Sequence, residues 1–176
     1  MTEEKDRLEV VSVRLVKDAP ILSGHKIQKP EDAIAVLSEF LCGLDREVVC
    51  VINLKTDGTP LNCHFASMGS VNQSIACPRE LFKSSILSNA ANMILVHNHP
   101  SGTLSPSKQD TALTDQMIKL CDMMGIPLLD HVIVGGDNKE YFSFKEKELL
   151  KNPHYLHCTD YKNLQFESPI ITERSR

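Results

Sequence analysis

Hydrophobic residues recur along this chain with two different periods, and the period indicates which kind of element each segment forms. Residues 11–15 (VSVRL) alternate between apolar and polar side chains, which predicts a half-buried strand. Residues 47–54 (EVVCVINL) are rich in β-branched side chains and predict a buried central strand. A turn signal at 56–60 leads into another apolar run at 61–68, so we expect these two strands to form a hairpin.

Helix start and stop signals mark three further segments, at residues 30–43, 78–89 and 105–124. The first two open with Pro followed by an acidic residue, which suits the first turn of a helix and its positive dipole end. Gly125 and then Pro127 follow the third segment in the order expected where a helix ends.

The rest of the pattern predicts strands at 93–96, 128–134 and 141–144 and a short helix at 145–150. The strand at 93–96 runs directly into His97. Strands that alternate with helices in this way predict a mixed α/β sheet with helices on its faces.

Length and composition predict a single globular domain at residues 10–150, between a flexible start at 1–9 and a polar tail at 151–176. The chain has 176 residues, of which 41% are hydrophobic and 24% charged, and this balance is typical of a globular protein. The formal net charge of −4 argues against non-specific DNA binding, because phosphate contacts require a basic surface.

Cysteine usage and the absence of long apolar runs favour a reducing cytoplasm. No pair of cysteines forms a C-x-x-C motif, which argues against a zinc ribbon or a redox centre. We expect most of the six to be small buried hydrophobes: Cys42, Cys50, Cys63, Cys77, Cys121 and Cys158. No N-terminal apolar segment resembles a signal peptide, and no run has the length of a membrane span, so no membrane partner is expected.

The segment 97–110 (HNHPSGTLSPSKQD) contains the residues most suited to chemistry. His97 and His99 are two apart on a strand and therefore point to one face, whereas Asn98 points away. Asp110 is expected in the first turns of the following helix. Two imidazoles and a carboxylate are a common ligand set for catalytic zinc, which keeps one position open for water and lowers its pKa to about 7.

This segment is similar to the JAMM pattern of the JAB/MPN superfamily, H-x-H followed by seven residues and S-x-x-D. It resembles the RadC branch more closely, since it reads HNHPSG followed by PS-x-x-D. Further RadC-like pieces occur in order at 45–54, 78–83 and 130–136, so the resemblance covers about residues 10–150. It implies a single-domain JAB/MPN-like mixed sheet flanked by helices, with a layered architecture similar to that of cytidine deaminases.

The resemblance also implies a role for each matching residue. His97, His99 and Asp110 match the metal ligands, with one Zn²⁺ per chain as the implied cofactor. Glu47 matches the general base, and Ser107 matches the serine that stabilises the tetrahedral intermediate. The implied reaction is hydrolysis of peptide or isopeptide bonds by a metal-bound water, with a peptide or protein as substrate. Iron and manganese also bind His and Asp, so these residue types do not select zinc.

Other interpretations of these residues remain open. The two histidines fit a core role with hydrogen bonds to the backbone, and Ser107 fits a helix cap with Asp110 three residues later. Glu47 fits an ordinary charged turn. Glu80 is a rival base, although an acid is expected in the first turn of a helix anyway. His131 fits a structural histidine with satisfied hydrogen bonds better than a site residue.

Two other classes of function also remain open. RadC proteins are traditionally associated with DNA repair, which favours a protein or nuclease accessory that acts on or with DNA. The chain begins too close to its first predicted strand to hold the helix-hairpin-helix region found in many RadC proteins, which lowers this expectation. A non-catalytic scaffold that binds partners is the other alternative. A zinc deaminase is excluded, because it needs H-x-E and P-C-x-x-C and position 99 is His.

Overall fold

In the part of the chain that it describes, the computed structural model contains five strands and three helices. It describes residues 12–18, 26–41, 44–68, 76–135 and 140–151. The elements follow the order α1 (Pro30–Leu41), β1 (Val48–Leu54), β2 (Pro60–Met68), α2 (Pro78–Leu87), β3 (Asn92–Asn98), α3 (Lys108–Met124), β4 (Leu128–Val134) and β5 (Tyr141–Ser143). Each of these elements was predicted from the sequence, to within a few residues at its ends.

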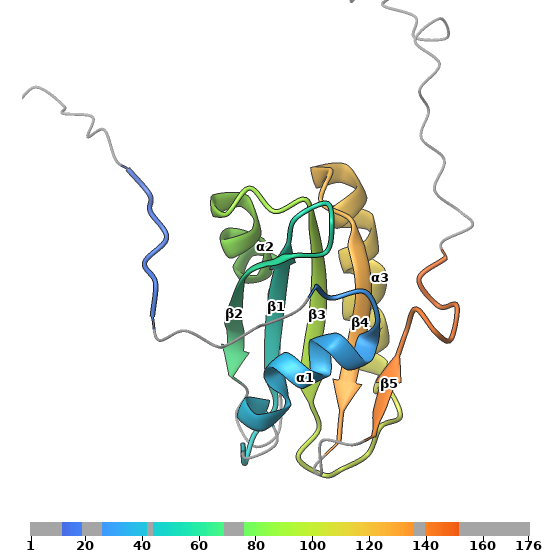
Figure 1. Cartoon of the computed structure of the whole chain (residues 1–176). Helices are drawn as coiled ribbons and strands as arrows, with labels where there is room; N and C mark the ends of the chain where they lie inside the picture. Colours follow the sequence, from blue (N-terminus) through green and yellow to red (C-terminus); the bar gives the residue numbers. More distant parts are fainter. Residues whose placement is uncertain (1–11, 19–25, 42–43, 69–75, 136–139, 152–176) are drawn as a thin grey trace, which may run out of the picture.

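The strands form one mixed sheet in the order β2-β1-β3-β4-β5 (Figure 1). β1 pairs antiparallel with both β2 and β3, so the expected hairpin and the interior position of β1 are confirmed. β3 and β4 pair in parallel. Parallel neighbours need a crossover connection, and α3 provides it between these two strands. The single-domain α/β sheet flanked by helices is therefore the observed architecture.

The helices cover both faces of the sheet, α1 on one side and α2 with α3 on the other (Figure 1). Side chains alternate between the faces along each strand. In β1, Cys50 and Ile52 pack into the apolar cluster under α1, whereas Val49 and Val51 pack into the cluster under α2 and α3. This is why β1 is apolar at every position except Asn53: all seven of its residues are buried.

Local signals at both ends of α3 position this helix against the sheet. Ser107 is the N-cap, and its hydroxyl accepts a hydrogen bond from the backbone of Asp110. Gly125 ends the helix in the left-handed conformation, with φ of 66°. The backbone N–H of Ile126 then donates to the carbonyl of Cys121, so that the chain turns directly into β4.

Two predicted elements and two predicted core positions are wrong. Residues 12–18 form no strand, and Val13 is 71% exposed, because alternation alone supplies no neighbouring strand to pair with; Val11 lies outside the described residues. Residues 145–150 form turns rather than a helix, and Glu148 has a φ of 58°, which interrupts a right-handed helix. The sequence cluster of Met117, Met123 and Met124 favours core positions for all three, but only Met117 is buried, and Met123 and Met124 are exposed in the last turn of α3.

Other expectations fall partly outside the described residues. Cys50 and Cys121 are buried as expected, whereas Cys63 is half-buried and Cys77 is exposed. Cys42, Cys158 and most of the predicted terminal segments at 1–9 and 151–176 lie outside the part of the chain that the structure describes. Within that part, no helix has the length and apolar character needed to span a bilayer.

Candidate metal centre

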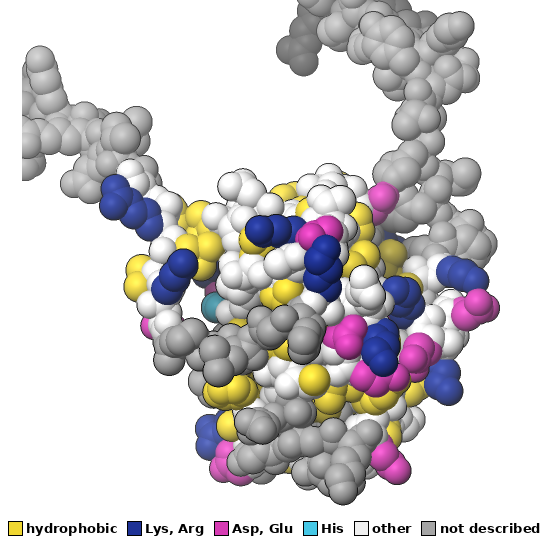
Figure 2. Space-filling view, viewed as in Figure 1, with side chains coloured by type: hydrophobic (Ala, Val, Ile, Leu, Met, Phe, Trp, Pro, Cys, Tyr) yellow, Lys and Arg dark blue, Asp and Glu magenta, His cyan; other side chains and the backbone are white. Residues whose placement is uncertain are grey.

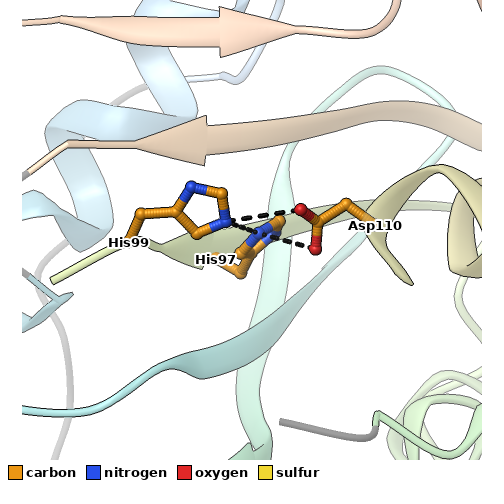
Figure 3. A group of neighbouring side chains, drawn as sticks. All are labelled: His97, His99 and Asp110. Carbon is orange, nitrogen blue, oxygen red and sulfur yellow. Dashed lines mark hydrogen bonds and ion pairs between the residues drawn. The ribbon is translucent and has the colours of Figure 1, made fainter. Parts of the chain in front are cut away.

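Three side chains that could hold a metal ion meet where β3 ends and α3 begins (Figure 3). Nε2 of His97 lies 3.2 Å from Oδ1 of Asp110, and Nε2 of His99 lies 3.4 Å from Oδ2 of the same carboxylate. The two Nε2 atoms are 2.9 Å apart. One ligand atom from each residue therefore lies within 4.8 Å of the others, close enough to surround one small cation.

The register of the sheet places both histidines on the α3 side. His97 pairs with Val49, which faces α2 and α3. His99 extends the same edge beyond the end of β3, because its backbone N–H donates to the carbonyl of Val134. Gly102 then turns the chain with φ of 77°, a conformation that favours glycine. This turn leads to the N-terminus of α3 and brings Asp110 back against the histidines.

The backbone also orients the ring of His99. Its Nδ1 lies 2.6 Å from the carbonyl oxygen of Thr103. A carbonyl oxygen can only accept a hydrogen bond, so Nδ1 must carry a proton and Nε2 faces Asp110. Backbone carbonyls commonly orient metal-binding histidines in this way.

The electrostatics of the cluster favour an anionic carboxylate. Burial opposes ionisation of Asp110, but its close contacts with His97 and His99 outweigh it and hold the pKa of this carboxyl far below its usual value. The neighbouring carboxylate of Asp110 in turn raises the pKa of His99. The two nitrogens and the ionised carboxylate form a donor set that suits a divalent cation such as zinc.

A cavity of about 230 Å³ opens beside these residues, and Glu47 lies on its wall. Glu47 is half-buried and directly precedes β1. His97 and Asp110 also line the cavity, so the carboxylate of Glu47 and two members of the cluster border the same space. Val49 and Leu113 add apolar surface to the wall. The arrangement can place a small polar group beside the cluster and an apolar group next to it.

Asn98, between the two histidines, holds the backbone on both sides of Glu47. Its Oδ1 accepts a hydrogen bond of 2.8 Å from the N–H of Val48, and its Nδ2 donates one of 3.0 Å to the carbonyl of Arg46. Asn98 points away from the histidines, as the strand period predicted. The sequence alone did not predict this role for Asn98, because no local pattern indicates that β1 pairs with β3.

Ser107 forms the helix cap that was one of its two interpretations. Its Oγ accepts from the N–H of Asp110 at 3.2 Å, and its own N–H donates to Oδ2 of Asp110 at 2.6 Å. The second of these bonds also orients the carboxylate. The rival base Glu80 lies elsewhere, on α2, where Lys83 pairs with its carboxylate at 2.6 Å.

His131 lies against the cluster, although its sequence context favoured a purely structural role. Its Nε2 is 2.8 Å from Nδ1 of His97, and its ring stacks on Phe144 with the centroids 4.9 Å apart. Burial lowers the pKa of His131 well below its usual value, so this ring is neutral. This contact arises because β3 pairs with β4, and the residues around His131 in the sequence do not indicate that pairing.

A histidine pair at a strand end, an aspartate at the next helix start and an α/β sheet between helices define a class of protein. This is the class of JAB-domain proteins, and the chain belongs to it: residues 27–149 match the RadC-like JAB domain family.

Relatives of the chain carry the name UPF0758 protein. The chain is 45% identical over 124 residues to the one from Desulforamulus reducens, which covers 70% of this chain and 54% of the relative. It is 40% identical over 129 residues to the one from Clostridium perfringens, covering 73% and 56%. It is 33% identical over 164 residues to one from Picosynechococcus sp., covering 85% and 67%. The chain thus spans about half the length of the first two relatives.

Proposed function

We propose that this chain is a metal-dependent hydrolase of peptide or isopeptide bonds, with zinc held by His97, His99 and Asp110. The observation that carries the proposal is the meeting of these three side chains beside a cavity that Glu47 also lines. Membership of the RadC-like JAB domain family supports it, because domains of this type are often hydrolytic.

Zinc, when bound, would polarise the carbonyl of the scissile bond and supply a water acidic enough to attack it near neutral pH. Glu47 takes the proton of that water at its carboxylate and passes it to the leaving amine. Asn98 accepts a hydrogen bond from the N–H of Val48 and donates one to the carbonyl of Arg46, and these two bonds support Glu47 at the cavity wall.

Ser107 is proposed to stabilise the oxyanion that forms on the attacked carbonyl. Its Oγ accepts a hydrogen bond as the cap of α3, and this leaves the hydroxyl proton to be donated. A single serine can therefore cap the helix and act in catalysis.

A peptide or protein is the proposed substrate, and the surface charge supports this over nucleic acid. Figure 2 shows basic and acidic side chains interspersed on the viewed face. Several charged side chains of the described residues form close pairs, among them Lys26 with Asp57 and Lys119 with Asp115. Phosphate backbones attract proteins through unpaired positive charge, and the formal net charge of the chain is −4.

The experiment that tests the proposal measures bound metal and turnover together. Elemental mass spectrometry should find about one zinc per chain, and no zinc in His99→Ala or Asp110→Ala. Glu47→Gln should keep the zinc and lose cleavage of a mixed library of peptides and lysine-branched isopeptides. Glu80→Gln is the matched control and should keep both, since Glu80 pairs with Lys83 away from the cavity.

Each result has a defined meaning. Failure of the parent chain to bind zinc, manganese or iron overturns the proposed centre and favours a scaffold that binds partners. Full turnover by Glu47→Gln overturns its assignment as the base. Cleavage of DNA or RNA, with all peptides left intact, would overturn the proposed substrate class.

A further inference from the structure

A buried chain of hydrogen bonds runs from α3 through β4 to His97. Oγ1 of Thr114 lies 2.6 Å from the carbonyl oxygen of Asp110 and 2.6 Å from Nδ1 of His131. Nε2 of His131 lies 2.8 Å from Nδ1 of His97. Thr114, His131 and His97 are 3%, 0% and 2% exposed, so each polar atom must find its partner within the chain.

The hydroxyl of Thr114 sets the direction of the first bond. The carbonyl of Asp110 is only an acceptor, so a separation of 2.6 Å requires the hydroxyl proton to point at it. If that proton pointed at His131 instead, two oxygen acceptors would face each other at 2.6 Å without a proton between them. Because the first hydrogen bond uses its single proton, the hydroxyl of Thr114 can only accept the second hydrogen bond, from Nδ1 of His131.

The direction of donation in this bond determines the direction of the next hydrogen bond, on the other side of the His131 ring. A neutral imidazole carries one proton, and here that proton is on Nδ1, which leaves Nε2 as an acceptor. Nε2 therefore accepts from Nδ1 of His97. The lone pair of His97 is left on Nε2, the nitrogen that faces His99 and Asp110.

We propose that Thr114 and His131 are positioning residues that select the tautomer of His97 able to bind a metal ion. The inference rests on the proposed metal centre. A ligating histidine must present an unprotonated nitrogen to the ion. With the opposite direction of hydrogen bonding, His131 would donate to Nδ1 of His97, and the proton of His97 would occupy Nε2 instead. His99 reaches the same tautomer by a different route, through the carbonyl of Thr103.

The packing around His131 suits this role. Phe144 stacks on the ring with an interplanar angle of 7°, which restricts its rotation. The neighbouring side chain of Asp130 bonds to other groups, since its oxygens accept from the hydroxyl of Ser143 and the backbone N–H groups of His131 and Lys145. The nitrogens of the ring are therefore left to Thr114 and His97.

The test compares Thr114→Val, which keeps the shape of the side chain and removes the hydroxyl, with Thr114→Ser, which keeps the hydroxyl. Zinc affinity is measured by competition with a coloured chelator. Thr114→Val should weaken zinc binding by about 10- to 100-fold, the usual effect of losing such an outer hydrogen bond. Thr114→Ser should bind zinc nearly as tightly as the parent, which a role in packing alone does not predict.

A second readout needs neither zinc nor a variant. Long-range ¹⁵N–¹H NMR of the metal-free parent identifies the protonated nitrogen of each histidine. We expect His131 to carry its proton on Nδ1, and a proton on Nε2 would overturn the inference even if Thr114→Val failed to fold. Unchanged zinc affinity in folded Thr114→Val would overturn the inference and leave the metal centre in place. A parent that binds no zinc overturns the proposed metal centre and this inference together.

Discussion

The two faces of the sheet are built from the same strands and yet differ in kind. In β3, Ile94 and Val96 pack into the cluster under α1, whereas Leu95 and His97 face α2 and α3. The α1 face is apolar at Ile94 and Val96, and the buried Asn98 on this face bonds to the backbone of β1 and of Arg46. The other face is apolar at Met93 and Leu95 and becomes polar at the carboxyl end of the strand.

Hydrogen bonds within the polar cluster allow it to be buried without a large loss of folding free energy. Buried polar groups destabilise a fold unless they are hydrogen-bonded. On the α3 face, His97, His131 and Thr114 bond to one another and to the backbone of Asp110. The apolar side chains of the α1 face need no such matching, and they pack the strands that carry the site against α1. The two faces should therefore respond differently to substitution.

The largest expected effect lies on the α1 face, where Leu37→Ala removes a fully buried side chain of α1. The cavity it leaves should lower the free energy of unfolding by about 2 to 5 kcal/mol, measured by urea denaturation. Zinc bound per folded chain should not change, because the proposed ligands face α3. Loss of zinc from folded Leu37→Ala would show that the two faces are not independent.

Removal of zinc should affect only the α3 face of the sheet, where the proposed ligands lie. At free zinc about 100 times its Kd, binding to the folded chain stabilises it by about 2.7 kcal/mol, and a chelator should remove this amount. The metal-free chain should still unfold cooperatively in thermal melts, because both apolar clusters remain. Unfolding of the chain by chelator alone would mean that the metal is part of the core.

Asn98→Ala tests whether the hydrogen bonds of Asn98 support Glu47 at the cavity on the other face of the sheet. The change leaves the buried N–H of Val48 without its partner, which should lower the free energy of unfolding by about 1 to 3 kcal/mol. Bound zinc should stay the same while turnover falls, because Glu47 loses its backbone support. The control is Asn62→Ala, which removes a hydrogen bond with Asn53 on β1, and it should keep full turnover per folded chain. Equal loss of turnover in both variants would contradict this role for Asn98.

The smallest effect is expected at Ser107, where stability and chemistry can be separated. Ser107→Ala should cost about 1 kcal/mol of stability through loss of the cap. Ser107→Asn keeps a capping oxygen, so it should recover the stability in thermal melts. Turnover should stay low in both variants if the hydroxyl binds the oxyanion. Recovered turnover in Ser107→Asn would limit Ser107 to capping.

Much of the fold could be predicted from the sequence, because its signals are local. Helix α3 ends at Gly125 as predicted, and it begins after Ser107 rather than at the predicted residue 105, since caps act on the backbone within one turn. The spacing of His97 and His99 likewise predicted a common face, which follows from the period of a strand. The position of Asp110 in the first turn of α3 completed a ligand set from one continuous segment.

What the tertiary structure decided depends on contacts between distant segments. Residues 12–18 carry the alternation of a strand but form none, because a strand also needs a neighbour to pair with. His131 and Asn98 have the local pattern of ordinary buried residues. Their contacts with His97 and with the backbone around Glu47 exist only because β3 pairs with β4 on one side and β1 on the other. Periodicity determines which face a side chain takes, whereas strand order determines what that side chain meets there.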